Sequence, residues 1–379
     1  MALTFDWFLP TTGDSRSLVG GGHSVPTDLG RAGGSIDTAG RFREPDLRYL
    51  AHVARTAEDL GFDAVLTPTG TPCEDAWVVT SALITQTERL KFLVALRPGL
   101  IAPTLLAQMA STFQRLSGDR LLLNVVVGGD RSEQLRFGDR IDKDSRYARA
   151  AEFLQVFRGS FGNEGTDFSG TFYDVEDART RQPATVPPIY LGGSSPAAGV
   201  VVAHHVDVYL TWGEPPADVA AKVDRIRALA AEAGRGVRFG VRLHTISRDR
   251  SEDAWTVADD MLAQLDPAEV RRTQAVLASS ESEGQRRMRA LHGGTAPSDA
   301  HALEIHPGLW SGIGLMRSGA GTALVGSHTE VADLIAEYAA VGIDEFVMSG
   351  YPHVEEAYWF AEGVLPILRR RELLSDTPP

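Results

Sequence analysis

The sequence predicts an α/β fold, a (β/α)₈ TIM barrel with inserted loops, from two patterns. Eight short and almost continuously apolar runs are bounded by Gly, Pro or polar residues, as expected of parallel strands that are buried on both faces. The segments between them repeat apolar residues at three- and four-residue steps, which indicates helices. Because strand and helix alternate without a break in composition, a barrel is favoured. A doubly wound open sheet is the alternative that the same alternation allows.

The apolar runs are the expected barrel strands. One of them, "RFGVRLHTI", is unusual because it carries two ionisable residues, Arg242 and His244. Between the strands, the spacing of Leu50, Val53 and Ala57 is typical of a helix with one buried face. In chain order, the expected strands cover residues 3–10, 63–68, 91–98, 121–128, 188–193, 206–213, 238–246 and 345–351.

Three stretches exceed a minimal barrel, and we expect them to be insertions within a single domain of residues 1–379. Residues 11–44 are rich in Gly, residues 160–187 suggest a small hairpin, and residues 247–344 have a polar and weakly periodic centre. Long connections in compact domains are often lids, so we expect a mobile lid at about 270–320. We expect all three insertions at the C-terminal mouth of the barrel, where barrel enzymes carry out their chemistry.

Composition excludes several classes of protein. The formal net charge is −13, whereas a nucleic-acid binder needs a basic face. No run of about 18 apolar residues suggests a membrane span, and the N-terminus lacks the pattern of a secretory signal. Cys73 is the single cysteine, so an internal disulfide is impossible and a reducing cytoplasm is expected. His, Asp and Glu show no metal-ligand spacing, so we expect no metal.

Polar and aromatic side chains gather where the expected strands end. Carboxyl ends of barrel strands meet at one mouth, so these side chains should lie near one another, and a purely structural mouth would not need such a mixture. They are Thr69, Cys73, Arg97, Asn124, Ser194, Ser195, Trp212, Arg242, His244 and Tyr351.

Two of these groups of residues suggest specific binding roles. Gly193, Ser194 and Ser195 follow a strand and form a candidate phosphate cradle, because glycine lets the backbone approach an anion and hydroxyl and amide groups donate to it; an ordinary Gly-Ser turn is the alternative. Arg242 and His244 should share one strand face. They indicate a binding site, the alternative being an ion pair with a buried carboxylate. By type alone, Cys73 and Trp212 could also be simple core residues.

Several motifs taken together resemble one known family. "WFLPTTGD", "PTGTPCEDAW", "RLKFLVALRPG", "YLGGSS", "TWGEPP", "RFGVRLHTI", "GAGTALVG" and "SGYPHVEEAY" occur in that order. The chain is similar in these motifs to the alkanesulfonate monooxygenases, which belong to the bacterial-luciferase-like flavin-dependent family. The resemblance runs from Phe5 to about Arg370.

The resemblance implies a fold and a reaction. Such enzymes are TIM barrels that take reduced FMN from a separate NAD(P)H-dependent flavin reductase, and they commonly form homo-oligomers. They use O₂ to cleave the carbon–sulfur bond of an organosulfonate, which gives an aldehyde and sulfite. A sulfonate is always ionised, and arginine offers it a rigid fork of donors.

The resemblance also implies roles for residues of this chain. Arg242 and His244 would be the active-site pair, with Arg242 handling a proton, and Arg317 would lie on the lid. Tyr351, Cys73 and Trp212 would line or support the same site, and Arg97 is a possible third arginine for the sulfonate. The FMN phosphate would bind at Gly193, Ser194 and Ser195, and the remaining cofactor contacts would be Thr69, Asn124, Arg146 and Tyr147.

The chain departs from these relatives in ways that bear on the substrate. The first insertion looks longer and adds His23, Arg31, Arg41 and Arg43, while Asp144 stands where relatives often carry His. A bulkier polar sulfonate, such as a sulfonated sugar, is therefore an alternative to simple alkanesulfonates. Two other classes remain open: a non-catalytic flavin-binding barrel and a deazaflavin-dependent dehydrogenase.

Overall fold

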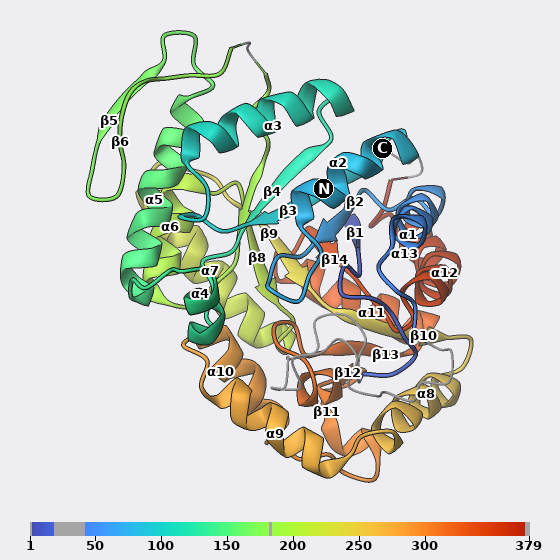
Figure 1. The fold of residues 1–379 in the computed structure, drawn as a ribbon. Coiled ribbons are helices and arrows are strands. Elements are labelled where there is room, and N and C mark those ends of the chain that lie inside the picture. Colours follow the sequence, from blue (N-terminus) through green and yellow to red (C-terminus); the bar gives the residue numbers. More distant parts are fainter. Residues whose placement is uncertain (1, 19–41, 182–183, 376–379) are drawn as a thin grey trace.

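The computed structural model describes residues 2–18, 42–181 and 184–375. Within them eight parallel strands close into a barrel in the order β1-β14-β9-β8-β7-β4-β3-β2 (Figure 1). The predicted TIM barrel is confirmed, and the open-sheet alternative is wrong because β1 pairs with both β2 and β14. The barrel strands are β1 (Thr4–Phe8), β2 (Ala64–Thr67), β3 (Lys91–Leu96), β4 (Leu121–Val125), β7 (Ile189–Leu191), β8 (Val208–Trp212), β9 (Arg238–Arg242) and β14 (Glu345–Val347).

The strands are apolar throughout because both of their faces are buried. One face fills the inside of the barrel with a cluster that includes Phe8, Leu66, Leu93, Leu122 and Leu210. The other face packs against the surrounding helices in the main core. The barrel interior is therefore a packed core, and ligands can enter only at its ends.

Helices surround the barrel and begin and end at residues that suit these positions. Asp46 caps α1, with its side chain accepting from the Tyr49 N–H, and Gly118 ends α3 at φ 71°, a conformation that favours glycine. The predicted helix face of Leu50, Val53 and Ala57 is buried. The helices are α1 (Leu47–Asp59), α2 (Ala76–Leu83), α3 (Pro103–Ser117), α4 (Arg131–Arg136), α5 (Lys143–Gly159), α6 (Pro196–His205), α7 (Pro216–Glu232), α11 (His328–Ala340), α12 (His353–Gly363) and α13 (Leu365–Arg370), with a short 3₁₀ turn at η1 (Ile84–Gln86).

The predicted strand 238–246 is two strands, so that expectation is wrong in part. Leu243 still donates to Val347 O of the barrel, but the His244 N–H donates to Thr322 O. From there β10 (His244–Arg248) leaves the barrel and pairs with β13 (Ala323–Ser327). The chain turns away because β13 offers it a second row of backbone partners. β12 (Leu309–Trp310) and β11 (Glu304–His306) complete this second sheet.

The polar stretch 247–344 is folded. It contains α8, α9 and α10, and Figure 1 shows α9 and α10 beside the second sheet, at the end of the barrel that carries α4. Its apolar residues, among them Trp255, Met261 and Trp310, form a core together with Ile246 of β10. The sequence predicts only a polar connection with a weakly periodic centre and a lid at about 270–320, because short strands leave no periodic pattern. Besides the strands, the elements are α8 (Ser251–Ala263), α9 (Pro267–Ala278), α10 (Glu283–Ala290), η2 (Ala300–Leu303) and η3 (Gly312–Leu315).

The other two insertions have different outcomes. Residues 160–187 contain the expected hairpin, β5 (Thr166–Ser169) and β6 (Asp174–Ala178), but its expected position at the C-terminal mouth is wrong. The hairpin connects helix α5 to strand β7, and such a connection lies at the N-terminal end of a barrel; in Figure 1 it projects away from α10. In the first insertion, residues 19–41, with His23, Arg31 and Arg41, lie outside the described residues.

None of the helices within residues 2–18, 42–181 and 184–375 combines the length and the hydrophobicity that a membrane crossing requires.

Candidate active site

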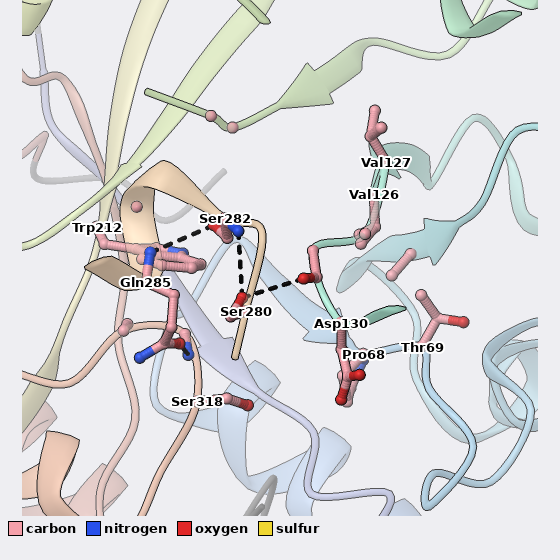
Figure 2. A pocket seen from close by; sticks show the side chains of 18 of the residues that line it. Pro68, Thr69, Val126, Val127, Asp130, Trp212, Ser280, Ser282, Gln285 and Ser318 are labelled. Carbon is pink, nitrogen blue, oxygen red and sulfur yellow. Dashed lines mark hydrogen bonds between the residues drawn. The ribbon is translucent and has the colours of Figure 1, made fainter. Parts of the chain in front are cut away.

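A cleft of about 350 Å³ opens at the C-terminal ends of the barrel strands, a volume within the usual range for small-molecule sites. Its walls come from the barrel loops and from the segment between α9 and α10. Figure 2 shows Trp212 and Gln285 across the cleft from Val126, Val127 and Thr69, with Ser280 and Ser282 between the two sides. The insertion that follows β9 and β10 therefore supplies part of the site.

Most of the predicted site residues meet at this cleft. Cys73, Arg146, His244 and Tyr351 are absent from its lining. The predicted residues that line it are Thr69, Asn124, Tyr147, Gly193, Ser194, Ser195, Trp212, Arg242 and Arg317, together with Arg97.

The Gly-Ser turn of residues 193–195 lines the cleft. Ser195 is the N-cap of α6, and its side chain accepts from the Ala198 N–H at 3.2 Å. Gly193 has a φ of 148°, and a Cβ at this position would lie 2.7 Å from Ala198 Cβ and 2.9 Å from the Tyr147 hydroxyl. Only glycine fits there. A helix N-terminus with nearby hydroxyl groups is a suitable site for an anion, so these residues fit the phosphate of FMN.

Arg242 and His244 converge on one hydroxyl group even though they belong to different strands. Arg242 Nη1 donates to Ser349 Oγ at 2.9 Å, and Ser349 Oγ lies 2.8 Å from His244 Nδ1. The guanidinium of Arg242 also lies over the Phe8 ring, at 4.5 Å. No carboxylate pairs with Arg242 among the described residues, and its Nη2 has no partner there. The alternative of a buried Arg–carboxylate pair is therefore wrong for Arg242.

Burial and neighbouring cations set the charge state of this pair. Burial, then the charge of Arg317, lowers the pKa of Arg242 well below its ordinary value, although a guanidinium remains protonated near neutral pH. Burial and the charges of Arg317 and Arg242 likewise hold the pKa of His244 well below its ordinary value. The imidazole is consequently neutral at pH 7.

Arg317 and Tyr351 extend this cluster. Arg317 Nη1 donates to the Tyr351 hydroxyl at 2.5 Å, and its guanidinium lies 5.2 Å from the centre of the same Phe8 ring. The Tyr351 ring stacks on His244 with 5.4 Å between ring centres. Two arginines on one aromatic ring place concentrated positive charge at the inner end of the cleft.

Cys73 lies near this cluster, with a protonated thiol. Burial raises its pKa to about 12, and the negative charge of Glu133 acts in the same direction. The charges of Arg97 and Arg317 act on it in the opposite direction and more weakly. A thiol that stays protonated is a poor nucleophile, which agrees with a supporting role and not with covalent catalysis.

Trp212 and Arg146 contact the segment that closes the cleft. Trp212 is half-buried and lines the cleft, so the core-residue alternative is wrong for it, and a Cβ on Gly284 would lie 2.9 Å from its ring. Arg146 is buried and donates to Glu281 at 2.8 Å and to Ile141 O at 2.9 Å. Arg146 therefore bonds to the closing segment through Glu281.

Sequence reasoning missed a buried Asp–His pair behind the cluster. His353 Nδ1 lies 2.9 Å from Asp14 Oδ1, and both side chains are fully buried. Tyr49 also donates to Asp14, while His353 Nε2 has no partner among the described residues. "TTGD" and "GYPH" contain the two residues, but nothing in the sequence shows that these distant motifs touch.

No group of three or more His, Cys, Asp or Glu side chains within the described part of the chain could hold a metal ion.

Comparisons with known proteins identify the class. The family model described as luciferase-like monooxygenase matches residues 4–345, so the chain belongs to the luciferase-like monooxygenase family. It is similar in structure to long-chain alkane monooxygenase LadA (TM-score 0.77, 17% identity, 100% of this chain and 93% of that chain covered). It is also similar to DmoA from Hyphomicrobium sulfonivorans (TM-score 0.75, 19% identity, 100% of this chain and 90% of that chain covered). A third similar structure is an F420-dependent secondary alcohol dehydrogenase (TM-score 0.67, 15% identity, 97% of this chain and 100% of that chain covered). At these identities the solved structures show the fold alone.

Proposed function

We propose that this protein is a two-component flavin-dependent monooxygenase that uses reduced FMN and O₂ to cleave the carbon–sulfur bond of an organosulfonate. A separate NAD(P)H-dependent reductase would supply the reduced flavin, and the cytoplasm would be the compartment. One observation carries the proposal: a single cleft holds an anion cradle at Gly193–Ser195 and a buried Arg242 that has no carboxylate partner in the described part of the chain. Two separate anions, the phosphate and the sulfonate, can be bound there together.

The cofactor side of the site would consist of Thr69, Asn124, Tyr147 and the cradle. Reduced FMN supplies the electrons with which O₂ is activated. The cradle would hold the phosphate, and Thr69 and Asn124 would approach the ring system. Arg146 would act through Glu281, since its guanidinium is bonded to that residue.

The substrate side would consist of Arg242, Arg317 and His244, supported by Tyr351 and Cys73. The arginines would hold the sulfonate with charge-assisted hydrogen bonds. His244 is neutral at pH 7 because its pKa is lowered, so its imidazole has a nitrogen that can accept a proton. Arg242 stays protonated and cannot, so His244 is the better proton acceptor of the two. Trp212 and the segment after α9 would exclude water from the reacting groups.

One assay tests the function. The purified protein is mixed with a flavin reductase, NAD(P)H and a panel of sulfonates, and sulfite is measured. Sulfite and the matching aldehyde support the proposal. Flavin binding without turnover would identify a flavin-binding barrel, and alcohol oxidation with deazaflavin and no sulfite would identify a dehydrogenase. Oligomeric state, which we expect to be a homo-oligomer, follows from light scattering.

Replacing Arg242 tests its assigned role. We expect Arg242→Ala to lower sulfite release by a factor of at least about 100, because a charge-assisted contact in a buried site is worth a few kcal/mol. Reduced-FMN binding, followed by fluorescence quenching, should change little because the cradle is formed by other residues, in the loop after β7. Turnover close to wild type by a folded variant would contradict the role.

A further inference from the structure

A second buried arginine lines the cleft under different electrostatic conditions. Arg97 follows β3, and its side chain is only 6% exposed. One nitrogen, Nη2, pairs with Glu133 of α4. Nε and Nη1 have no hydrogen-bond partner among the described residues, and the Phe137 ring lies 5.3 Å from the guanidinium. Arg97 lines the cleft, and the guanidinium therefore holds two donors, buried within the cleft wall, that the described residues leave unpaired.

Glu133 supplies the matching acceptor. Its second oxygen, Oε1, accepts from the Thr71 N–H at 2.9 Å, and both residues line the cleft. A carboxylate has about four acceptor positions, and two contacts leave capacity for more. The Thr71 contact also fixes the orientation of the carboxylate, so donors and acceptors are presented together on a rigid wall.

The charge of this pair differs from that of the inner cluster, which consists of Arg242, His244, Arg317 and Tyr351. Arg97 is neutralised by Glu133, whereas Arg242 has no carboxylate partner among the described residues. Arg97, Glu133 and Arg317 all act electrostatically on the Cys73 thiol, so the pair and the inner cluster border the same part of the site. An anion gains more at Arg242 than beside Glu133, where a carboxylate already occupies the cation.

We propose that Arg97 and Glu133 bind hydroxyl groups on the part of the substrate that lies beyond the sulfonated carbon. A hydroxyl group is neutral and both donates and accepts a hydrogen bond, which matches this pair. A plain alkyl chain would leave the donors of Arg97 unpaired in a buried wall. The inference rests on the proposed function and refines it: the substrate is a hydroxylated organosulfonate.

The test compares two substrates that differ only in their hydroxyl groups, propane-1-sulfonate and 2,3-dihydroxypropane-1-sulfonate. We expect the wild type to favour the diol in kcat/KM for sulfite release by at least about tenfold. Arg97→Met and Glu133→Gln should each bring that ratio close to one. Glu133→Gln keeps the size of the side chain, so it still tests the inference if Arg97→Met does not fold. Arg131→Met removes a cation from an exposed position of α4 outside the cleft and should keep the preference.

Binding separates failure of this inference from failure of the proposed function. Calorimetric titration of the same two ligands is made with wild type, Glu133→Gln and Arg131→Met. If no sulfonate yields sulfite, the proposed function is wrong, but tighter binding of the diol that Glu133→Gln abolishes would still support the pair as a hydroxyl site. Equal use and equal binding of the two ligands by wild type would overturn the inference, as would a preference that both variants retain.

Discussion

At the scale of single residues, burial decides the chemistry of the site more than residue type does. Cys73 and His244 are both ionisable, yet both are neutral at pH 7, because burial raises the pKa of the thiol and lowers that of the imidazole. Arg242 remains charged under the same conditions because its ordinary pKa is so high. The inner end of the cleft therefore combines fixed cations with neutral groups that can exchange protons.

The reactivity of Cys73 follows from this. At pH 8 a thiol with a pKa of about 12 has about a thousandfold less thiolate than one with its ordinary pKa. We expect iodoacetamide to modify the folded protein far more slowly than the protein unfolded in urea, and the folded rate should still rise between pH 9 and 11. Mass spectrometry reads the result without ambiguity, since the chain has one cysteine. A folded-state rate that levels off near pH 9 would contradict the raised pKa.

At the scale of elements, two ionic contacts hold α10 and the segment before it, residues 279–282, over the cleft. Glu214, after β8, binds Arg287 of α10 through both carboxylate oxygens and Lys222 of α7 at 2.5 Å. Glu281 binds Arg146 of α5, and its N–H donates to Gly129 O. Burial alone would raise the pKa of Glu214, but Arg287 and Lys222 lower it. The mobility of the expected lid at 270–320 stays a prediction, and these contacts are where it can be tested.

Removing the charge of Glu214 should loosen α10. Glu214→Gln leaves Lys222 buried without a counter-charge and Arg287 with a weaker acceptor, a cost typical of a broken buried pair of about 3 kcal/mol. We expect backbone amides of residues 283–290 to exchange hydrogen at least about tenfold faster, as measured by mass spectrometry. Glu283→Gln, which removes an exposed pair with Arg286 in the same helix, is the control and should have little effect. Equal exchange in both variants would show that the contact does not hold the helix.

At the scale of the whole molecule, four polar side chains meet inside the barrel near the start of its strands. Asp6 of β1 and Glu345 of β14 hydrogen-bond to each other, and Glu345 also accepts from Arg238 of β9 at 3.1 Å. Tyr190 of β7 lies within 3.5 Å of Arg238. Burial, and then the charge of Glu345, raises the pKa of Asp6, and burial raises that of Glu345. This pair retains a proton that the unfolded chain would release.

The sign of the pH dependence follows from these raised pKa values. The contribution of the pair is fully present below the unfolded pKa, near 4, and is lost as the pH rises through the folded pKa. Asp6→Asn mimics the protonated acid and does not titrate. As the pH rises from 5 to 9, the free energy of unfolding of the wild type should therefore fall relative to that of the variant. Urea unfolding across this range measures it. Curves that stay parallel would mean that Asp6 is ionised in the folded protein.

The extent to which the fold was predictable differs along the chain. The barrel strands were predictable because burial on two faces demands continuous apolar residues, as in "KFLVAL". β11 and β12 were missed because strands of three and two residues are too short to show periodicity. α10, "EGQRRMRA", was missed because it buries mainly Gly284, Gln285 and Met288. The break at Leu243 depends on β13, which lies 80 residues further along the chain.

The candidate site shows the same division. Positions at strand ends pointed to Asn124, Trp212 and Arg242, because parallel strands bring their carboxyl ends to one mouth. The pairing of Arg97 with Glu133, and of Asp14 with His353, had no sequence signal.

The alternation of apolar strands and amphipathic helices, and the polar residues at the strand ends, belong to the sequence by itself, since each follows from neighbours within one element. Only the tertiary structure decided which charges are neutralised and which are not, because that depends on closure of the barrel and on where a distant insertion packs. The difference between Arg97, which pairs with Glu133, and Arg242, which has no carboxylate partner within the described residues, is of this second kind, and the proposed division of the substrate between the two arginines rests on it.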